Sequence, residues 1–247
     1  MRPILFGLFV FMLSATALNG QAAILALIFG DKVASENFNI SLELGGGFTG
    51  FTNKPDGLKR KVAIQFGIGS NIKLSDHFYL MPTAYFLSSR EAKLGTISLF
   101  PGSSLDNTVT EANTELLINY IDVPIFFYYQ FNNPKWRIGL APQVAFRTNA
   151  SLNYTLENED VYKQIIKEEV NSIDFGLLYS VSYVVASGRK GKGLIFSLRY
   201  YQGMLDVFNP SLTVMNENSK SNYFGMVMSF PFLTDKLAEK YRKPENK

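Results

Sequence analysis

Seven charged residues of this chain stand where apolar residues alternate with small or polar ones, and each falls on the polar side of that alternation. They are Glu43, Lys73, Asp122, Arg137, Arg147, Asp174 and Arg199. Charges that are withdrawn from water must be paired or neutralised. We therefore expect an internal charge network in which Asp122 and Asp174 pair with the three arginines of this set. The same groups could instead line a narrow pore or a proton path.

Catalytic chemistry has few candidates in this sequence. The single histidine, His77, follows Asp76, and an Asp–His pair can serve general acid–base catalysis. Because Ser75-Asp76-His77 separates two strand-like stretches, we interpret His77 as a turn residue. There is no cysteine, no second histidine for a metal site and no GxSxG motif, since GIGSN at 67–71 lies inside a strand-like stretch. The sequence therefore predicts no enzyme, no metal site and no cofactor.

The elements that position the charged residues are expected to be β-strands. In the stretch FNISLELGGGFTG, which starts at Phe38, apolar residues alternate with polar residues or glycine. Successive side chains of a strand point to opposite faces, and one apolar face with one small or charged face is typical of a transmembrane β-barrel. The pattern predicts eight strands, at 38–50, 61–74, 78–89, 115–131, from 135, and at 173–187, 193–204 and 223–232.

The spacers between these stretches predict the topology. Three of them are short, whereas the other four are long and lie near 51–60, 90–114, 151–172 and 205–222. Outer-membrane barrels have short periplasmic turns and longer extracellular loops, and a barrel of eight strands has a lumen that side chains can fill. We expect an all-β fold, an eight-stranded antiparallel up-and-down transmembrane β-barrel with three short periplasmic turns, four longer extracellular loops and both termini in the periplasm.

One long spacer leaves its structure open. Within 157–170, Val161, Ile165 and Val170 lie roughly on one side of an amphipathic helix. The same residues could continue the flanking strands as a hairpin that turns near 158–160, and we favour the hairpin slightly. Either structure is a candidate for binding an external partner.

The ends of the chain differ from its middle. Met1 and Arg2 precede an apolar run, and a small-x-small sequence at 20–22 follows, which is the layout of a secretory signal peptide. We expect a signal peptide at 1–22, with cleavage near residue 17 as the alternative, a periplasmic lead-in segment at 23–37, the barrel at 38–232 and a charged periplasmic tail at 233–247. The absence of cysteine excludes a lipoprotein anchored through that residue.

Five segments of the chain together carry a resemblance to a known family. They are IFGDKVASENF at 28–38, YIDVPIFFYYQF at 120–131, IGLAPQVAF at 138–146, IDFGLLYS at 173–180 and LRYYQGMLDV at 198–207. In their order and spacing, these segments resemble the PorT-like outer-membrane β-barrel family of Bacteroidota. Many relatives carry a lysine where Tyr128 stands in this chain, so a role of that position in the lumen does not carry over. The resemblance implies an eight-stranded outer-membrane barrel, and the best-known members of the family serve protein export through the type IX secretion pathway.

We therefore expect a non-enzymatic integral protein of the cell outer membrane that binds or scaffolds other envelope proteins. Its expected partners are outer-membrane lipid and envelope or secretion-system proteins. The net charge of +3 is too small and too dispersed to indicate nucleic-acid binding. The alternatives are a narrow pore and a soluble barrel that binds an apolar ligand. A soluble barrel would place Phe66, Ile125 and Phe196 inside and the charged residues outside.

Overall fold

Nine β-strands make up the regular structure of the described part of the chain. The computed structural model describes residues 37–98, 111–132, 135–156, 160–186, 193–210, 212, 215–216 and 218–231. The strands are β1 (Phe38–Phe51), β2 (Lys59–Lys73), β3 (Phe78–Ser98), β4 (Glu111–Gln130), β5 (Trp136–Thr155), β6 (Val161–Ile165), β7 (Ile173–Ala186), β8 (Gly193–Gly203) and β9 (Ser221–Pro231). Within these ranges, no helix has the length and apolarity to cross a membrane. The expected signal peptide, nearly all of the lead-in segment and the tail lie outside the described residues.

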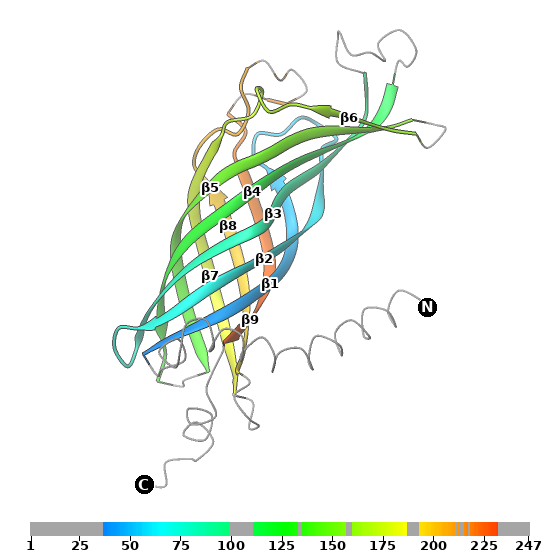
Figure 1. Ribbon diagram of the computed structural model, residues 1–247. Coiled ribbons are helices and arrows are strands. Elements are labelled where there is room, and N and C mark those ends of the chain that lie inside the picture. Colours follow the sequence, from blue (N-terminus) through cyan, green and yellow to red (C-terminus); the bar gives the residue numbers. More distant parts are fainter. Residues whose placement is uncertain are drawn as a thin grey trace, which may run out of the picture.

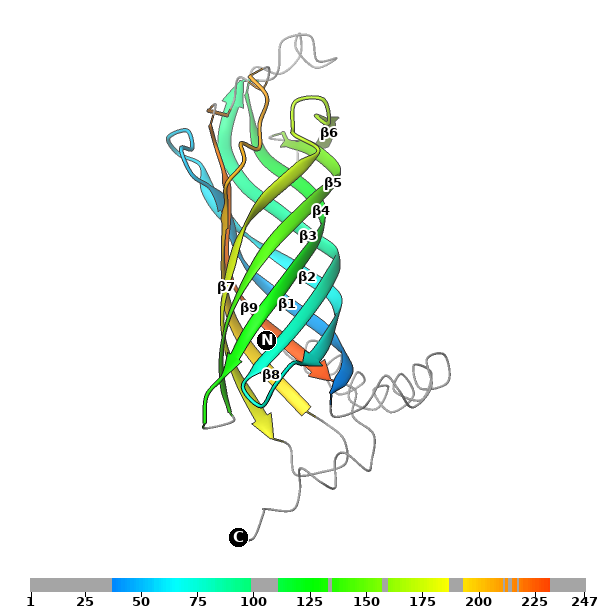
Figure 2. The same ribbon diagram turned by 90° about the vertical axis from the view of Figure 1, so that its left-hand side faces the viewer.

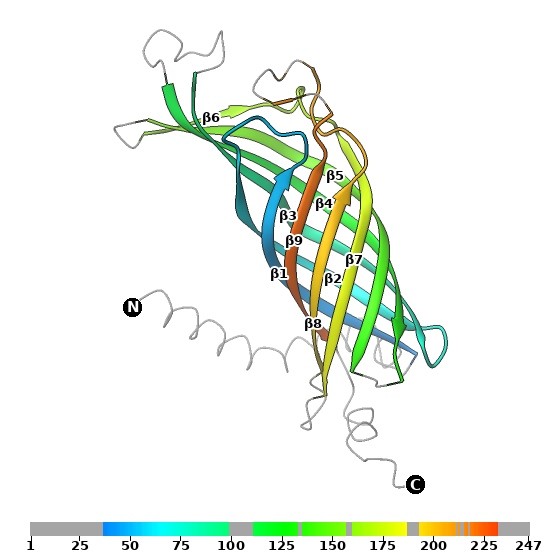
Figure 3. The same cartoon turned by 180° about the vertical axis from the view of Figure 1, so that it is seen from behind.

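Eight of these strands close into an antiparallel barrel (Figure 1). Each strand pairs with its neighbour in the order β1, β2, β3, β4, β5, β7, β8 and β9, and β9 pairs with β1 to complete the ring. Figure 2 shows that the strands are strongly tilted, and Figure 3 shows β1, β9 and β8 side by side where the ring closes. The expected eight-stranded antiparallel barrel is confirmed.

The two ends of the barrel differ in their connections. At one end, which we call the turn end, residues 74–77, 131–135 and 187–192 join consecutive strands. At the other end, the loop end, β3 runs to Ser98 rather than to the expected residue 89, and β5 runs to Thr155. The connections at the loop end are therefore shorter than the sequence indicated, because the strands continue into them.

The segment at 157–170 contains the hairpin and not the helix, as far as it is described. Strand β6 pairs antiparallel with the far end of β5, so that Val161 lies opposite Thr155 and Ile165 lies opposite Ser151. The slightly favoured alternative is therefore confirmed over 160–165. Figure 1 shows β6 along the upper end of β5, away from the ring of the barrel.

The strands turn their apolar side outward. Phe66 and Ile125 are each 40% exposed, and Phe196 is half-buried. By contrast, Glu43 is 0% exposed and Arg199 is 2% exposed. The inverted arrangement, on which the alternative of a soluble barrel depended, is therefore wrong.

Among the register shifts of the ladders, one β-bulge on β3 and one on β5 change which residues face inward. On β3, Phe66 of β2 lies opposite Leu87 while Gly67 lies opposite Tyr85, so Phe86 is an extra residue. As a result Phe86 and Leu87 are both exposed, and Ser88 and Arg90 turn inward and are buried. On β5, Asn119 of β4 lies opposite Asn149 while Tyr120 lies opposite Arg147, so Thr148 is an extra residue. An extra residue in one strand exchanges the faces of every residue beyond it.

Tyrosine rings cover glycines on the inner wall. A Cβ atom added to Gly139 would meet the ring of Tyr128, which lies opposite it on β4. The ring of Tyr85 lies over Gly67 in the same way. A glycine leaves room for the ring of its cross-strand neighbour, and the ring in turn shields the bare backbone. These pairs fill a lumen that is too narrow for two large side chains at one level.

An apolar cluster occupies the loop end, and we call it the apolar cap. Its residues are Phe51, Leu58, Ala92, Leu116, Ile118, Tyr120, Ala145, Ala150, Leu152, Tyr154, Ile166, Val170, Val207, Phe208, Leu212 and Met215. Three connections contribute to it together with β1, β3, β4 and β5. Fully burying one large apolar side chain stabilises a structure by about 1.5–3 kcal/mol, so the cap holds these connections in fixed positions.

The pairing of Gly139 with Tyr128 predicts a specific instability. We expect Gly139→Ala to lower the free energy of unfolding by about 1–3 kcal/mol, because the added methyl group displaces the Tyr128 ring. Adding Tyr128→Ala to this variant should recover part of the lost free energy of unfolding. Urea unfolding in detergent micelles measures both values. Gly46→Ala is the control, since its nearest atom, the Ala63 carbonyl oxygen, stands at 3.2 Å. Equal losses for Gly139→Ala and Gly46→Ala would contradict the packing described here.

Candidate functional site

One row of cross-strand neighbours, which we call the acidic row, carries the three buried acids of the described residues. Glu43 lies opposite Gly67, which lies opposite Tyr85, which lies opposite Asp122. Continuing round the barrel, Asp122 lies opposite Ala145, and Ala145 lies opposite Asp174. Two of these acids meet cationic side chains that come from other rows.

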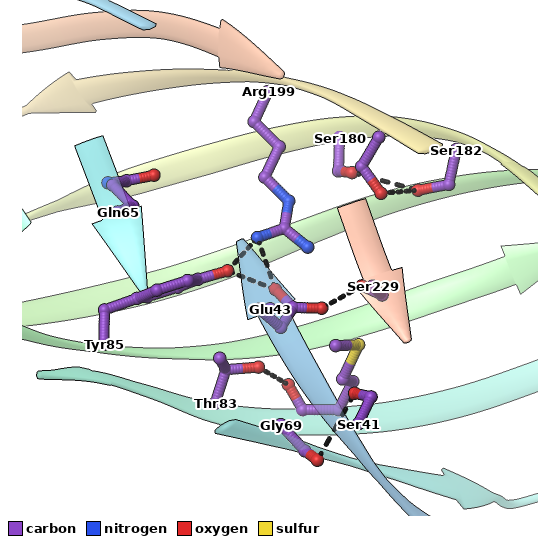
Figure 4. A network of polar contacts seen from close by, with 12 residues as sticks. Ser41, Glu43, Gln65, Gly69, Thr83, Tyr85, Ser180, Ser182, Arg199 and Ser229 are labelled. Carbon is purple, nitrogen blue, oxygen red and sulfur yellow. Dashed lines mark hydrogen bonds and ion pairs between the residues drawn. The ribbon is translucent and has the colours of Figure 1, made fainter. Parts of the chain in front are cut away.

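The first ion pair of the lumen joins β8 to β1 (Figure 4). Arg199 Nη1 donates to Glu43 Oε2 at 2.9 Å, and both side chains are buried. The hydroxyl groups of Tyr85 and Ser229 also contact the Glu43 carboxylate. The Arg199 guanidinium lies 4.5 Å from the centre of the Phe126 ring. Glu43 is thus held by donors from three other strands.

The second ion pair joins β3 to β4. Arg90 Nη2 donates to both carboxylate oxygens of Asp122, at 3.2 and 3.1 Å, and both side chains are 0% exposed. Ser88 donates to Asp122 Oδ2 at 2.6 Å. Rings surround the Arg90 guanidinium at 4.7–5.3 Å, and they belong to Tyr120, Tyr201 and Tyr223. Contact with aromatic faces stabilises a desolvated cation, by about 2 kcal/mol in favourable cases.

The third buried acid, Asp174, is bound by hydroxyl groups. Tyr201 and Ser221 both donate to its Oδ2 atom. Its Oδ1 atom has no hydrogen-bond partner among the described residues. Nearer the turn end, Tyr128 donates to Ser180 at 3.0 Å, and Ser180 in turn contacts Ser182. Uncharged hydroxyl groups therefore continue the polar filling of the lumen beyond the ion pairs.

The pairing expected from the sequence is wrong. Asp122 pairs with Arg90, which was not among the candidate residues, and Arg199 pairs with Glu43. Arg90 was missed because the expected strand ended at residue 89 and residue 90 was assigned to a loop. Strict alternation would also have turned Arg90 outward, whereas the bulge at Phe86 turns it inward. The sequence signal is the adjacent apolar pair Phe86-Leu87, which interrupts the alternation.

The remaining candidate residues lie toward the barrel ends. Arg137 Nε donates to Gln130 Oε1 at 2.8 Å, and its guanidinium lies 4.3 Å from the centre of the Tyr79 ring. Arg147 Nε donates to the Asn171 carbonyl oxygen at 3.3 Å. Arg137 and Arg147, two of the three arginines expected to pair with the acids, therefore contact an amide, an aromatic ring and a backbone carbonyl.

Lys73 and His77 belong to the turn end. Lys73 Nζ lies 2.7 Å from Asp76 Oδ1, and this hydrogen bond lowers the pKa of the Asp76 carboxyl group below its usual range. The ring of His77 is hydrogen-bonded through Nδ1 to the Gln130 carbonyl oxygen at 3.1 Å and stacks on Tyr129. Asp76 and His77 thus have separate partners, which fits the interpretation of His77 as a turn residue.

In the described part of the chain, no group of three or more His, Cys, Asp or Glu residues could hold a metal ion. The buried acids and bases face one another and the hydroxyl groups of tyrosine and serine. Such a site can fix the positions of the strands, because one ion pair links the adjacent strands β3 and β4 and the other links β1 to β8 across β9.

A model of the family described as outer membrane protein beta-barrel domain matches residues 29–209. The chain belongs to this family. It is therefore an integral outer-membrane β-barrel protein, and the apolar outer wall faces lipid. On such a wall a lysine or arginine at the middle of the membrane costs about 2–4 kcal/mol, so the inward position of the arginines agrees with membership of the family.

Solved outer-membrane proteins are similar to this chain. The attachment invasion locus protein Ail of Yersinia pestis is 9% identical over 80% of this chain and 100% of its own, with a TM-score of 0.42. OprG of Pseudomonas aeruginosa is 11% identical over 78% and 94%, with a TM-score of 0.35. Neisserial surface protein A is 14% identical over 79% and 97%, with a TM-score of 0.35. No curated protein matches the chain.

The Arg90–Asp122 pair predicts a large energetic coupling. We expect Arg90→Met and Asp122→Asn each to lower the free energy of unfolding by about 3–5 kcal/mol, because either change leaves one charge buried alone. The double variant should lose much less than the sum of the two losses. Urea unfolding in lipid bilayers measures the free energy of unfolding of the wild type, of the two single variants and of the double variant.

Lys73→Gln serves as the matched control, because it breaks an ion pair at the exposed Asp76. We expect this change to have no measurable effect on the free energy of unfolding, since exposed ion pairs contribute little. Additive losses in the Arg90→Met/Asp122→Asn variant would show that the two groups do not act as a pair.

Proposed function

We propose that this outer-membrane barrel is non-enzymatic, that it binds or scaffolds other envelope proteins, and that it supports type IX protein secretion. In this proposal the loop end is extracellular and both chain termini lie in the periplasm. Support for the secretion role comes from the resemblance of five segments, among them 120–131 and 198–207, to the PorT-like proteins of Bacteroidota.

The ordered structure at the loop end carries the proposal. Strands β3, β4 and β5 continue beyond the ring residues that pair with β7, and the apolar cap packs the connections against them. The connections are also tied together, since Thr52 N donates to the Lys220 carbonyl oxygen and Asn171 N donates to that of Val207, both at 2.8 Å. A surface that is already ordered loses little conformational entropy on binding, which favours the docking of a protein partner.

The filling of the lumen favours a scaffold over a narrow pore. Both ion pairs lie in the middle of the barrel with side chains at most 2% exposed. The apolar cap lies beyond them at the loop end. A conducting path would have to separate paired charges in a medium of low dielectric, where breaking such a pair costs about 3–5 kcal/mol. We therefore propose that the barrel is closed to ions, and the narrow pore remains the alternative.

Affinity purification from detergent-solubilised outer membranes tests the proposal. We expect the full chain to retrieve other envelope proteins, and components of the type IX pathway among them would support the secretion role. Phe208→Ser, which introduces a hydroxyl group into the apolar cap beside Phe51, should reduce this retrieval. Heat-resistant mobility on gels should persist in that variant, because Phe208 lies outside the strands of the barrel.

Phe224→Leu is the control, since Phe224 is exposed on the outer wall, and it should retrieve the same proteins as the wild type. Retrieval of no envelope protein by the wild type would contradict the scaffold. Steady ion conductance of the wild-type protein in planar bilayers would select the narrow pore instead.

A further inference from the structure

Strand β6 forms an open edge at the loop end. It is the last strand in the order of the sheet, and β5 is its single partner among the described strands. The ring of the barrel closes without it, because β4 and β7 both pair with β5. Figure 1 shows β6 beside the end of β5, outside the closed wall. An open edge presents unpaired backbone groups to any chain that approaches in an extended form.

The hydrogen bonds of β6 show which of its residues face the open edge. Leu156 N donates to the Asp160 carbonyl oxygen, and Ile166 N donates to the Ala150 carbonyl oxygen. In an antiparallel ladder, the residues that bond to the partner strand alternate with residues whose N–H and C=O groups point the other way. The even positions of β6 therefore bond to β5. The backbone groups of Val161, Lys163 and Ile165 point to the open edge.

The side chains of the same three residues share one face. Val161 is 63% exposed and Ile165 is 54% exposed, and the exposed Lys163 stands between them. Lys163 forms no ion pair with the described residues. A strand that pairs with this edge places its own side chains opposite these three, about 4.5–5.5 Å away. The edge therefore selects a partner with an apolar, an acidic and an apolar residue at alternate positions.

A second copy of β6 fits this edge poorly. Antiparallel pairing that places Val161 opposite Ile165 of the copy also places Lys163 opposite Lys163. Like charges directly opposite each other on a sheet are destabilising. The charge pattern therefore favours a different chain over self-association.

We propose that β6 binds an extended segment of a protein partner, which adds as a strand and places an acidic side chain opposite Lys163 between two apolar side chains. This inference rests on the proposed scaffold function and names the surface and the chemistry of its partner. Backbone hydrogen bonds from the residues at 161, 163 and 165 provide affinity, and the three side chains provide specificity.

Fluorescence anisotropy with the full chain in detergent micelles tests this edge. The probe is a short labelled peptide with Val, Glu and Ile at alternate positions and threonine elsewhere, and the matched probe has lysine in place of glutamate. We expect the glutamate peptide to bind about tenfold more tightly than the lysine peptide. In the Lys163→Glu variant the lysine peptide should bind more tightly than the glutamate peptide.

Two variants separate strand addition from nonspecific contact. Ile165→Pro removes an N–H group that points to the open edge and leaves the bonds to β5 intact, so it should abolish binding of both peptides. Tyr162→Thr changes an exposed residue on the opposite face of β6 and should bind as the wild type does. Heat-resistant gel mobility shows that each variant keeps its barrel.

Binding of the glutamate peptide that is unchanged in Ile165→Pro would overturn the inference, and so would absence of binding to the wild type. Dimerisation of the wild type that Ile165→Pro abolishes would also overturn it, since β6 would then pair with itself. If Ile165→Pro retrieves the same envelope proteins as the wild type, the scaffold function stands and its docking site lies elsewhere.

Discussion

The structure depends on the enclosure of charge inside a narrow barrel. The outer wall faces lipid, so an ionised side chain at the middle of the membrane must point inward and be paired or hydrogen-bonded there. Arg90 meets Asp122 and Arg199 meets Glu43, and each pair links two strands of the wall. The small residues of the acidic row, including Gly67 and Ala145, are needed because a lumen of eight strands has room for few large side chains at one level.

The inward-facing positions change from polar to apolar between the middle of the lumen and the loop end. Bulges at Phe86 and near Thr148 exchange the faces of β3 and β5 between the acidic row and the loop end. Beyond the bulges the inward positions are mostly apolar, as at Leu116 and Leu152, and they meet the connections in the apolar cap. A polar interior at the middle of the barrel thus changes to an apolar core at the loop end, which holds the surface that we propose for partners.

Much of the fold could be predicted from alternation alone. Period two in the sequence indicated the strands, their outward apolar face and the closed antiparallel order, because lipid on one side and a lumen on the other impose opposite chemistry on the two faces. Arg90 could not be placed this way, since a single extra residue at Phe86 reverses the faces beyond it. The partners of Asp122 and Arg199 depend on which rows meet across the lumen, and that is decided by the stagger of the closed barrel rather than by local sequence.

Site-directed spin labelling tests the orientation of the strands most directly, because the chain has no native cysteine to replace. Single cysteines at Phe66 and Ile125 on the outer wall, and at Gln143 and Ser197 on the inner wall, would carry the label in lipid bilayers. Collisions with oxygen, which is concentrated in hydrocarbon, should be frequent at Phe66 and Ile125 and rare at Gln143 and Ser197. The reverse pattern would show that the charged face meets the surroundings, and the account of an outer-membrane barrel with enclosed ion pairs would be wrong.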